Sequence, residues 1–174
     1  MMAAPLEIER KYLIERPAEE VLHSLPEASA TQITQTYLTM QADGFGRRVR
    51  KRGSDAGGWE YTYTRKQHIG FGKRIELEDT ITQAQYEALL QEADPALHTI
   101  EKVRWCFTDR GQHFELDVYA FSQTLATLEI ELPDIDTPVQ LPEMLHILRD
   151  VTDRNGYSNL ALSKTLAFPG QGES

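Results

Sequence analysis

The sequence lacks the features that mark secreted, membrane-spanning and nucleic-acid-binding proteins. Its 174 residues include one cysteine, Cys106, which cannot form an internal disulfide. No run approaches the roughly 18 apolar residues that a membrane-spanning helix needs, and the opening MMAAPLEIERK has no apolar segment of a secretory signal. A formal net charge of −9 opposes a general nucleic-acid-binding surface, because phosphate neutralisation drives much of that affinity. We therefore expect a cytoplasmic protein with no membrane or nucleic-acid partner.

Helical patterns are also few, and strand patterns fill the space between them. Capping residues and apolar spacing predict helices at Pro17–Leu25, Thr82–Ala93, Leu141–Val151 and Tyr157–Leu166. Alternation of apolar and polar residues predicts about eight strands, at Leu6–Leu13, Ile33–Met40, Phe45–Arg52, Trp59–Lys66, Lys73–Ile81, Ile100–Phe107, His113–Tyr119 and Ala126–Leu132. No linker or repeat interrupts them, so we expect one domain over residues 1–174, with a core at about 5–165 and a tail at 166–174.

The predicted strands have one apolar side and one charged side. In LEIERKYL, Leu6, Ile8 and Tyr12 point one way, whereas Glu7, Glu9 and Lys11 point the other. The same parity across all strands collects eight acids and eight bases, which are Glu7, Glu9, Glu76, Glu78, Glu115, Asp117, Glu129, Glu131, Lys11, Arg48, Arg50, Arg52, Lys66, Arg74, Lys102 and Arg104.

This charged set is balanced in sign, and acidic strands are largely separate from basic ones. Paired carboxylates such as Glu7 and Glu9 repel each other unless a cation lies between them, and arginine forks suit phosphate oxygens. A closed antiparallel barrel of about eight strands, mainly β with a few helices outside, would place the charges in an aqueous lumen. The sequence therefore predicts a charged lumen that holds a divalent cation and an anion.

The motifs in this charged set resemble those of the CYTH family, the triphosphate tunnel metalloenzymes. EIERK at Glu7–Lys11 is similar to the family's ExExK signature. The resemblance continues in order over roughly residues 5 to 165, through RVR at Arg48–Arg50, Lys66, RIELE at Arg74–Glu78, EKVR at Glu101–Arg104, FELDV at Phe114–Val118, LEIEL at Leu128–Leu132 and DVTDRNGYSN at Asp150–Asn159.

The resemblance implies an eight-stranded tunnel that binds a linear triphosphate and a divalent metal. The metal carboxylates implied are Glu7, Glu9, Glu129 and Glu131, with Glu76 and Glu78 in the same lumen. The triphosphate-binding residues implied are Lys11, Arg48, Arg50, Lys66, Arg74, Lys102 and Arg104, and catalytic roles fall to Lys11, Arg50 and Glu131. Oxygen ligands suit Mg²⁺ or Mn²⁺. Some relatives carry lysines where this chain has Ser158 and Leu160.

We expect hydrolysis of inorganic tripolyphosphate to pyrophosphate and phosphate. Class IV adenylate cyclase, thiamine triphosphatase and a non-catalytic polyphosphate- or nucleotide-binding module are the alternatives, because all would use the same metal and phosphate groups. ATP and thiamine triphosphate thus stay open as ligands, and so does a homodimer. Two glycine-containing segments, GFGR at Gly44–Arg47 and GFGK at Gly70–Lys73, do not fit the spacing of a P-loop and are predicted to be turns.

Overall fold

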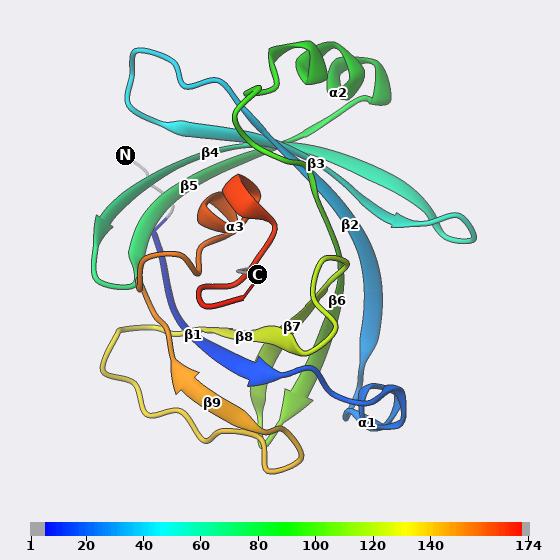
Figure 1. Ribbon diagram of the computed structural model, residues 1–174, viewed down its shortest axis with the longest axis vertical. Helices are drawn as coiled ribbons and strands as arrows, with labels where there is room; N and C mark the ends of the chain where they lie inside the picture. Colours follow the sequence, from blue (N-terminus) through cyan, green and yellow to red (C-terminus); the bar gives the residue numbers. More distant parts are fainter. Residues whose placement is uncertain (1–5, 172–174) are drawn as a thin grey trace.

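Eight strands form a closed antiparallel barrel in this computed structural model, which describes residues 6–171 (Figure 1). Their bounds are β1 (Leu6–Glu15), β2 (Ser29–Leu38), β3 (Gly46–Ser54), β4 (Gly58–Gly70), β5 (Lys73–Ile81), β6 (Ile100–Asp109), β7 (Gln112–Tyr119) and β8 (Leu125–Glu131). Their order is β5-β4-β3-β2-β6-β7-β8-β1, and β1 returns to β5 through the pairs Leu6–Ile75, Glu7–Arg74 and Ile8–Lys73. The predicted closed barrel is confirmed.

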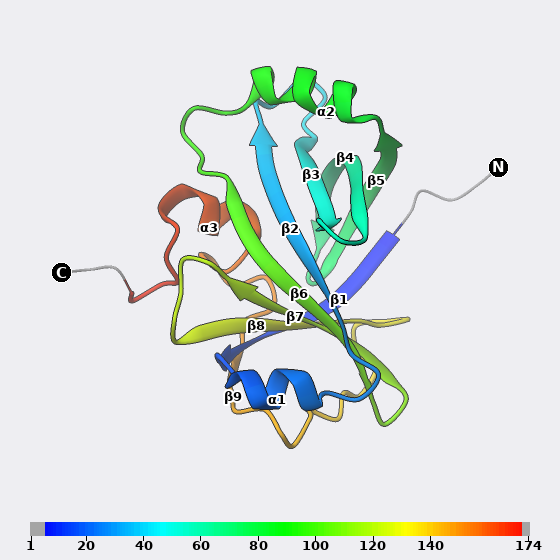
Figure 2. The ribbon, with the colours of Figure 1, turned by 90° about the vertical axis from the view of Figure 1, so that its right-hand side faces the viewer.

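The apolar side of the strands faces outward and is covered at two places. Leu22 and Leu25, in and just after α1 (Glu19–Ser24), pack with strand residues such as Leu116 and Leu128. Elsewhere Tyr86 of α2 (Gln83–Leu89) and the following 3₁₀ turn η1 (Leu90–Glu92) pack with Val49 and its neighbours. Figure 2 shows α1 and α2 at opposite ends of the molecule. No helix within residues 6–171 is long and apolar enough to cross a membrane.

The third helix, α3 (Asn159–Thr165), lies inside the outline of the barrel in Figure 1. It helps to form an apolar cluster with Leu13, Ile100 and Tyr119, which share a face of their strands with the charged residues. This apolar plug, defined as Leu13, Ile100, Tyr119, Val151, Tyr157, Leu162 and Phe168, closes one end of the lumen. Phe168 is 1% exposed, so part of the segment expected to be a tail belongs to the core.

The helix expected at Leu141–Val151 is wrong. Residues 141–146 are irregular, and β9 (Ile147–Asp150) is a short strand that pairs with Tyr12–Ile14 of β1. The reason lies in β1, whose contact with β5 ends at Ile8 and leaves the edge beyond it free for another strand. Met144 and Leu148, which gave the segment its helical spacing, are 41% and 40% exposed and do not form a buried helical stripe.

Candidate active site

The register of the strands brings all the predicted site residues to the inner face of the barrel. Residues directly opposite each other in antiparallel strands lie on the same face. Glu7 lies opposite Arg74, Glu9 opposite Glu131, and Lys11 opposite Glu129. The register between the other strands places the remaining predicted site residues on the same face. These are Arg48, Arg50, Lys66, Glu76, Glu78, Lys102 and Arg104. Their placement in one lumen is confirmed, whereas their roles in binding and catalysis stay predictions.

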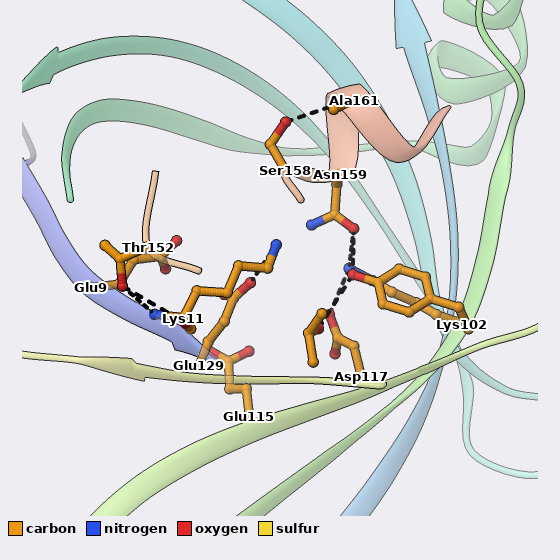
Figure 3. Close-up of polar contacts among 12 residues, drawn as sticks. Glu9, Lys11, Lys102, Glu115, Asp117, Glu129, Thr152, Ser158, Asn159 and Ala161 are labelled. Carbon is orange, nitrogen blue, oxygen red and sulfur yellow. Dashed lines mark hydrogen bonds and ion pairs between the residues drawn. The ribbon is translucent and has the colours of Figure 1, made fainter. Parts of the chain in front are cut away.

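One wall of the lumen is acidic and is built by β1 and β8. We call Glu7, Glu9, Glu129 and Glu131 the acid wall. Glu129 is buried, and Lys11 Nζ lies 3.3 Å from its Oε1 (Figure 3). Burial alone would raise the pKa of Glu129, but the positive charges of Lys11, Arg104 and Lys102 together lower that pKa to about 2. Glu129 is therefore ionised at neutral pH.

The other acids of this wall repel their neighbours. Burial, followed by the hydrogen bond to Glu76 and the charges of Glu76 and Glu131, raises the pKa of Glu7 to about 7. Burial and the charge of Glu129 also raise the pKa of Glu9. Carboxylates that raise one another's pKa lack sufficient positive charge between them. This wall accordingly favours a cation.

A turn between β4 and β5 fixes the backbone of the acid wall. The Glu9 amide donates to the Gly72 carbonyl oxygen at 3.0 Å. Gly72 has a φ of +66°, and a Cβ at this position would lie 2.6 Å from Ile135 Cδ1 and 2.9 Å from the Glu9 carbonyl oxygen. Glycine is thus required by both conformation and space. The GFGK segment is a turn, as predicted, and its contact with Glu9 contributes to the site.

Arg74 links the acid wall to the carboxylates of β5. Its guanidinium lies 2.6 Å from Glu9, 3.4 Å from Glu7 and 3.3 Å from Glu76. Glu76 also faces Arg48 and Lys66, each at 3.5 Å, and its pKa falls to about 2 although burial alone would raise it. Glu78 similarly pairs with Arg50 at 2.9 Å. The predicted metal ligands of β5 therefore have basic partners in this structure.

The acid wall fits a hard cation by the chemistry of its donors. All of its side-chain ligands are carboxylate oxygens, the kind that Mg²⁺ and Mn²⁺ prefer. Within residues 6–171, no three carboxyl, imidazole or thiol side chains are already gathered closely enough to hold a metal ion. Donor type and mutual repulsion therefore support a metal site here, while the ligand set itself stays a prediction.

A second cluster joins two bases to one buried acid. Lys102 Nζ lies 2.8 Å from Asp117, and Arg104 lies 2.8 Å from the same carboxylate and 2.5 Å from Glu115. We call Lys102, Arg104 and Asp117 the neutralised cluster. Asp117 holds the pKa of Arg104 well above its usual range despite burial, and burial lowers the pKa of Lys102 to about 7.

Helix α3 also contacts the neutralised cluster. Asn159 Oδ1 accepts hydrogen bonds from Lys102 Nζ at 3.3 Å and from the Tyr119 hydroxyl at 2.7 Å (Figure 3). The Ser158 side chain caps the helix by accepting from the Ala161 amide. The sequence placed Asp117 in the charged set but gave it no role, and it gave none to Asn159. Only the register and the folded helix bring these residues to Lys102.

A third cluster is basic and incompletely paired. Arg48 and Arg50 are each 5% exposed, yet the Nε atom of each is buried without a hydrogen-bond partner among the described residues. The same holds for Gln35 Oε1 and Thr62 Oγ1. We call Gln35, Arg48, Arg50 and Thr62 the open cluster. Burial, followed by the charges of Arg48 and Arg104, lowers the pKa of Arg50 to about 10 although Glu78 opposes the shift.

A cavity lies at the end of the barrel away from α3. This cavity of about 720 Å³ is lined by residues from the end of β6 and the start of β7, including Cys106, His113 and Glu115, and by Glu131 of the acid wall. The apolar plug instead includes Ile100 and Tyr119, at the other ends of the same two strands. The cavity and the apolar plug thus lie at opposite ends of β6 and β7, and we call the end with the cavity the mouth of the barrel.

Comparison with known sequences identifies one family. The sequence model of the CYTH domain matches residues 5–162 of this chain. A search of curated proteins found no significant match to this chain.

Comparison with solved structures agrees with the fold. The inorganic triphosphatase NE1496 is 29% identical over 98% of this chain and 99% of its own, with a TM-score of 0.60. The protein PH1819 from Pyrococcus horikoshii OT3 is 19% identical over 74% of this chain and 80% of its own, with a TM-score of 0.55. A putative adenylate cyclase from Bacillus halodurans is 16% identical over 78% and 84%, with a TM-score of 0.51. The last two share the fold alone.

Proposed function

The chain belongs to the CYTH family, and we propose that it is a metal-dependent triphosphatase that converts tripolyphosphate into pyrophosphate and phosphate. Enzymes of this family depend on a divalent metal in general. One observation carries the proposal. In a single lumen, the acid wall, whose carboxylates raise one another's pKa, faces the open cluster, whose arginines keep Nε donors that are unpaired among the described residues. A divalent metal would neutralise the first, and the oxygens of a triphosphate would accept hydrogen bonds from the second.

The similar protein NE1496, described as an inorganic triphosphatase, supports the choice of substrate. The residues that would hold Mg²⁺ or Mn²⁺ are Glu7, Glu9 and Glu129, with a second, weaker position near Glu131. A bound divalent ion would neutralise phosphate charge and activate a water molecule. Hydrolysis of a phosphoanhydride otherwise depends mainly on positioning and electrostatics, which the protein's own side chains supply.

Basic side chains on the facing walls would bind the phosphate chain. Arg48, Arg50 and Lys66 would hold the pyrophosphate part and stabilise its charge as the bridging P–O bond breaks. Lys11, beside Glu129, would hold the terminal phosphoryl group, and Glu131 at the mouth would orient the attacking water. Arg74 and the neutralised cluster complete the positive field around the substrate.

Lys102 is held by direct contacts with Asp117 and Asn159. It lies opposite Tyr119, at the end of β7 that carries the apolar plug, whereas Glu131 lines the cavity at the other end of that strand. Lys102 would therefore bind phosphate oxygens. The water oxygen would form the new P–O bond, and its proton would pass to Glu131, the carboxylate that orients it.

Phosphate release is the direct test of the proposed activity. The purified protein is supplied with tripolyphosphate, ATP or thiamine triphosphate, each with Mg²⁺ or Mn²⁺, and cyclic AMP is measured in the ATP reactions. We expect tripolyphosphate to give the fastest release and ATP to give no cyclic AMP. Cyclic AMP without orthophosphate would identify a cyclase, and binding without turnover would identify a binding module.

The metal ligands are tested in the same assay. Glu7→Gln and Glu129→Gln each remove one carboxylate with little change of shape and should abolish most metal-dependent release. Glu101→Gln is the matched control, because Glu101 is exposed and lies on the outer face of β6. Full activity in both acid-wall variants would refute the assignment. The cytoplasmic location and a homodimer stay predictions.

A further inference from the structure

The open cluster contains two uncharged side chains that the proposed mechanism does not use. Gln35 is fully buried on β2, and Thr62 is 3% exposed on β4. In the strand register both lie directly opposite Arg50, one on each side of it. Cross-strand partners have Cβ atoms about 5 Å apart. The three side chains therefore form one continuous row across the lumen wall.

Each member of this row has a polar atom without a partner. Buried polar groups in folded proteins are almost always hydrogen-bonded, and leaving one unpaired costs roughly 1–3 kcal/mol. Yet Arg50 Nε, Arg48 Nε, Thr62 Oγ1 and Gln35 Oε1 all lack a partner among the described residues. Three of these atoms belong to the row and the fourth to Arg48, two residues along β3, and together they indicate a ligand that would complete their hydrogen bonds.

The chemistry of the row indicates an oxyanion as that ligand. Arg48 and Arg50 donate only, and the Thr62 hydroxyl can donate as well. Gln35 Nε2 lies 3.3 Å from the Tyr37 hydroxyl, but amide oxygen and nitrogen are interchangeable by a flip. In the flipped orientation the Tyr37 hydroxyl donates to the Gln35 oxygen, and the amide NH₂ is free to donate into the lumen. The row then presents donors alone.

The position of the row relative to the acid wall is also defined. In the order β5-β4-β3-β2-β6-β7-β8-β1, β2 is four strands from β1 in either direction, and β3 is four strands from β8. Strands four apart in a closed eight-stranded barrel lie across the lumen from each other. Gln35 also lies opposite Ile100 of the apolar plug. The row thus faces the acid wall near the end that the apolar plug closes.

We propose that Gln35 and Thr62, together with the Nε atoms of Arg48 and Arg50, form a subsite for one phosphoryl group of the triphosphate. This inference rests on the proposed function and adds two specificity-determining residues to it. The group bound here lies near the apolar plug, because Gln35 lies opposite Ile100. With Gln35 in the flipped orientation, its free NH₂ group and the Thr62 hydroxyl both donate, which suits an oxyanion and not a metal ion.

Isothermal titration calorimetry of tripolyphosphate binding to the metal-free protein in EDTA tests the subsite. A hydrogen bond to a charged group contributes about 1.5–3 kcal/mol, so Thr62→Val and Gln35→Met should each raise the Kd by roughly 10- to 100-fold. Thr62→Ser should restore binding. Thr80→Val is the matched control, because Thr80 lies opposite Thr62 but is exposed.

Thermal unfolding separates a binding role from a structural one. Valine has nearly the shape of threonine and removes the unpaired hydroxyl, so Thr62→Val should leave the Tm of the ligand-free protein unchanged or raise it. Weaker binding with an unchanged or higher Tm supports the subsite. Wild-type affinity in both variants would overturn it and leave the proposed function intact. Failure of the wild-type protein to bind or hydrolyse tripolyphosphate would instead overturn both.

Discussion

The two basic clusters of the lumen differ in how their charge is balanced. In the neutralised cluster, Asp117 accepts from both Lys102 and Arg104 and raises the pKa of Arg104 despite its burial. In the open cluster, burial and neighbouring arginines lower the pKa of Arg50 to about 10, and its Nε has no partner among the described residues. Both clusters lie on the same inner surface. The arginines of the open cluster have Glu76 and Glu78 as carboxylate partners, yet their Nε donors have no partner among residues 6–171.

This difference distinguishes residues that stabilise the lumen from residues that are available to bind a ligand. A buried base paired with a buried acid is held in one position, and removing either partner leaves an uncompensated charge. A buried base with free donors lowers the stability of the ligand-free protein. An anion that binds to those donors restores that stability. Substitutions in the first cluster should therefore act mainly on stability, and those in the second mainly on binding.

The largest effect is expected from Asp117→Asn. Asp117 is 1% exposed, and its loss would leave Lys102 and Arg104 buried without their shared carboxylate. We expect the free energy of unfolding to fall by about 3–5 kcal/mol, measured by urea denaturation. A loss below about 1 kcal/mol would show that this cluster does not depend on its acid.

A smaller but more specific effect is expected from Arg50→Lys. Lysine keeps the charge but loses the planar fork and its Nε donor. We expect kcat/KM for tripolyphosphate to fall by roughly 100-fold, with the unfolding free energy changed by less than about 1 kcal/mol. Arg52→Lys, two residues along the same strand and partly exposed, is the matched control. Equal losses in both variants would contradict the distinct role of the open cluster.

Lys11 tests whether a base paired with the acid wall also binds substrate. Its ammonium lies 3.3 Å from Glu129 and is 9% exposed, whereas Lys51 lies on the outer face with Nζ 4.2 Å from the centre of the Trp59 ring. Lys11→Ala should reduce kcat/KM by about 10-fold or more. Lys51→Ala should leave it nearly unchanged. Steady-state kinetics of the two variants at one metal concentration test whether Lys11, but not Lys51, contributes to kcat/KM.

The smallest effect is a pH dependence of stability from the acid wall. The pKa of Glu7 is about 7 in the folded protein and near 4.5 when unfolded. Because folding raises the pKa of Glu7, its protonated carboxyl stabilises the folded protein. This contribution is complete below pH 4.5 and is lost as the pH rises through 7. In EDTA, the Tm of the wild type should therefore fall from pH 5 to 7 more than that of Glu7→Gln. Parallel curves would mean that Glu7 titrates normally.

Much of the fold follows from period-two alternation, because a closed barrel converts parity directly into inside and outside. From the sequence alone, that rule predicts a position in the lumen for Glu7, Glu9, Lys11, Glu129 and Arg50. It did not reveal β9, because the free edge of β1 arises only from the stagger between β1 and β5. Hydrophobic spacing in residues 141–151 resembled a helix, and strand pairing overrode it.

Pairing within the site could not be predicted from the sequence. Asp117 and Glu115 share a face and a strand, but only the register gives Asp117 both Lys102 and Arg104. Gln35 and Thr62 belong to ordinary polar positions of two strands, and their unpartnered atoms become evident only when burial is known. Asn159 reaches the lumen because α3 packs into one end of it, a contact between residues far apart in the chain.

Product analysis of tripolyphosphate by ³¹P nuclear magnetic resonance tests the central claim most directly. With Mg²⁺ or Mn²⁺, the wild-type protein should release pyrophosphate and orthophosphate in equal amounts. Addition of EDTA should stop the reaction, and Arg50→Lys should slow it strongly while the protein remains folded. An unchanged tripolyphosphate spectrum with either metal would contradict the account.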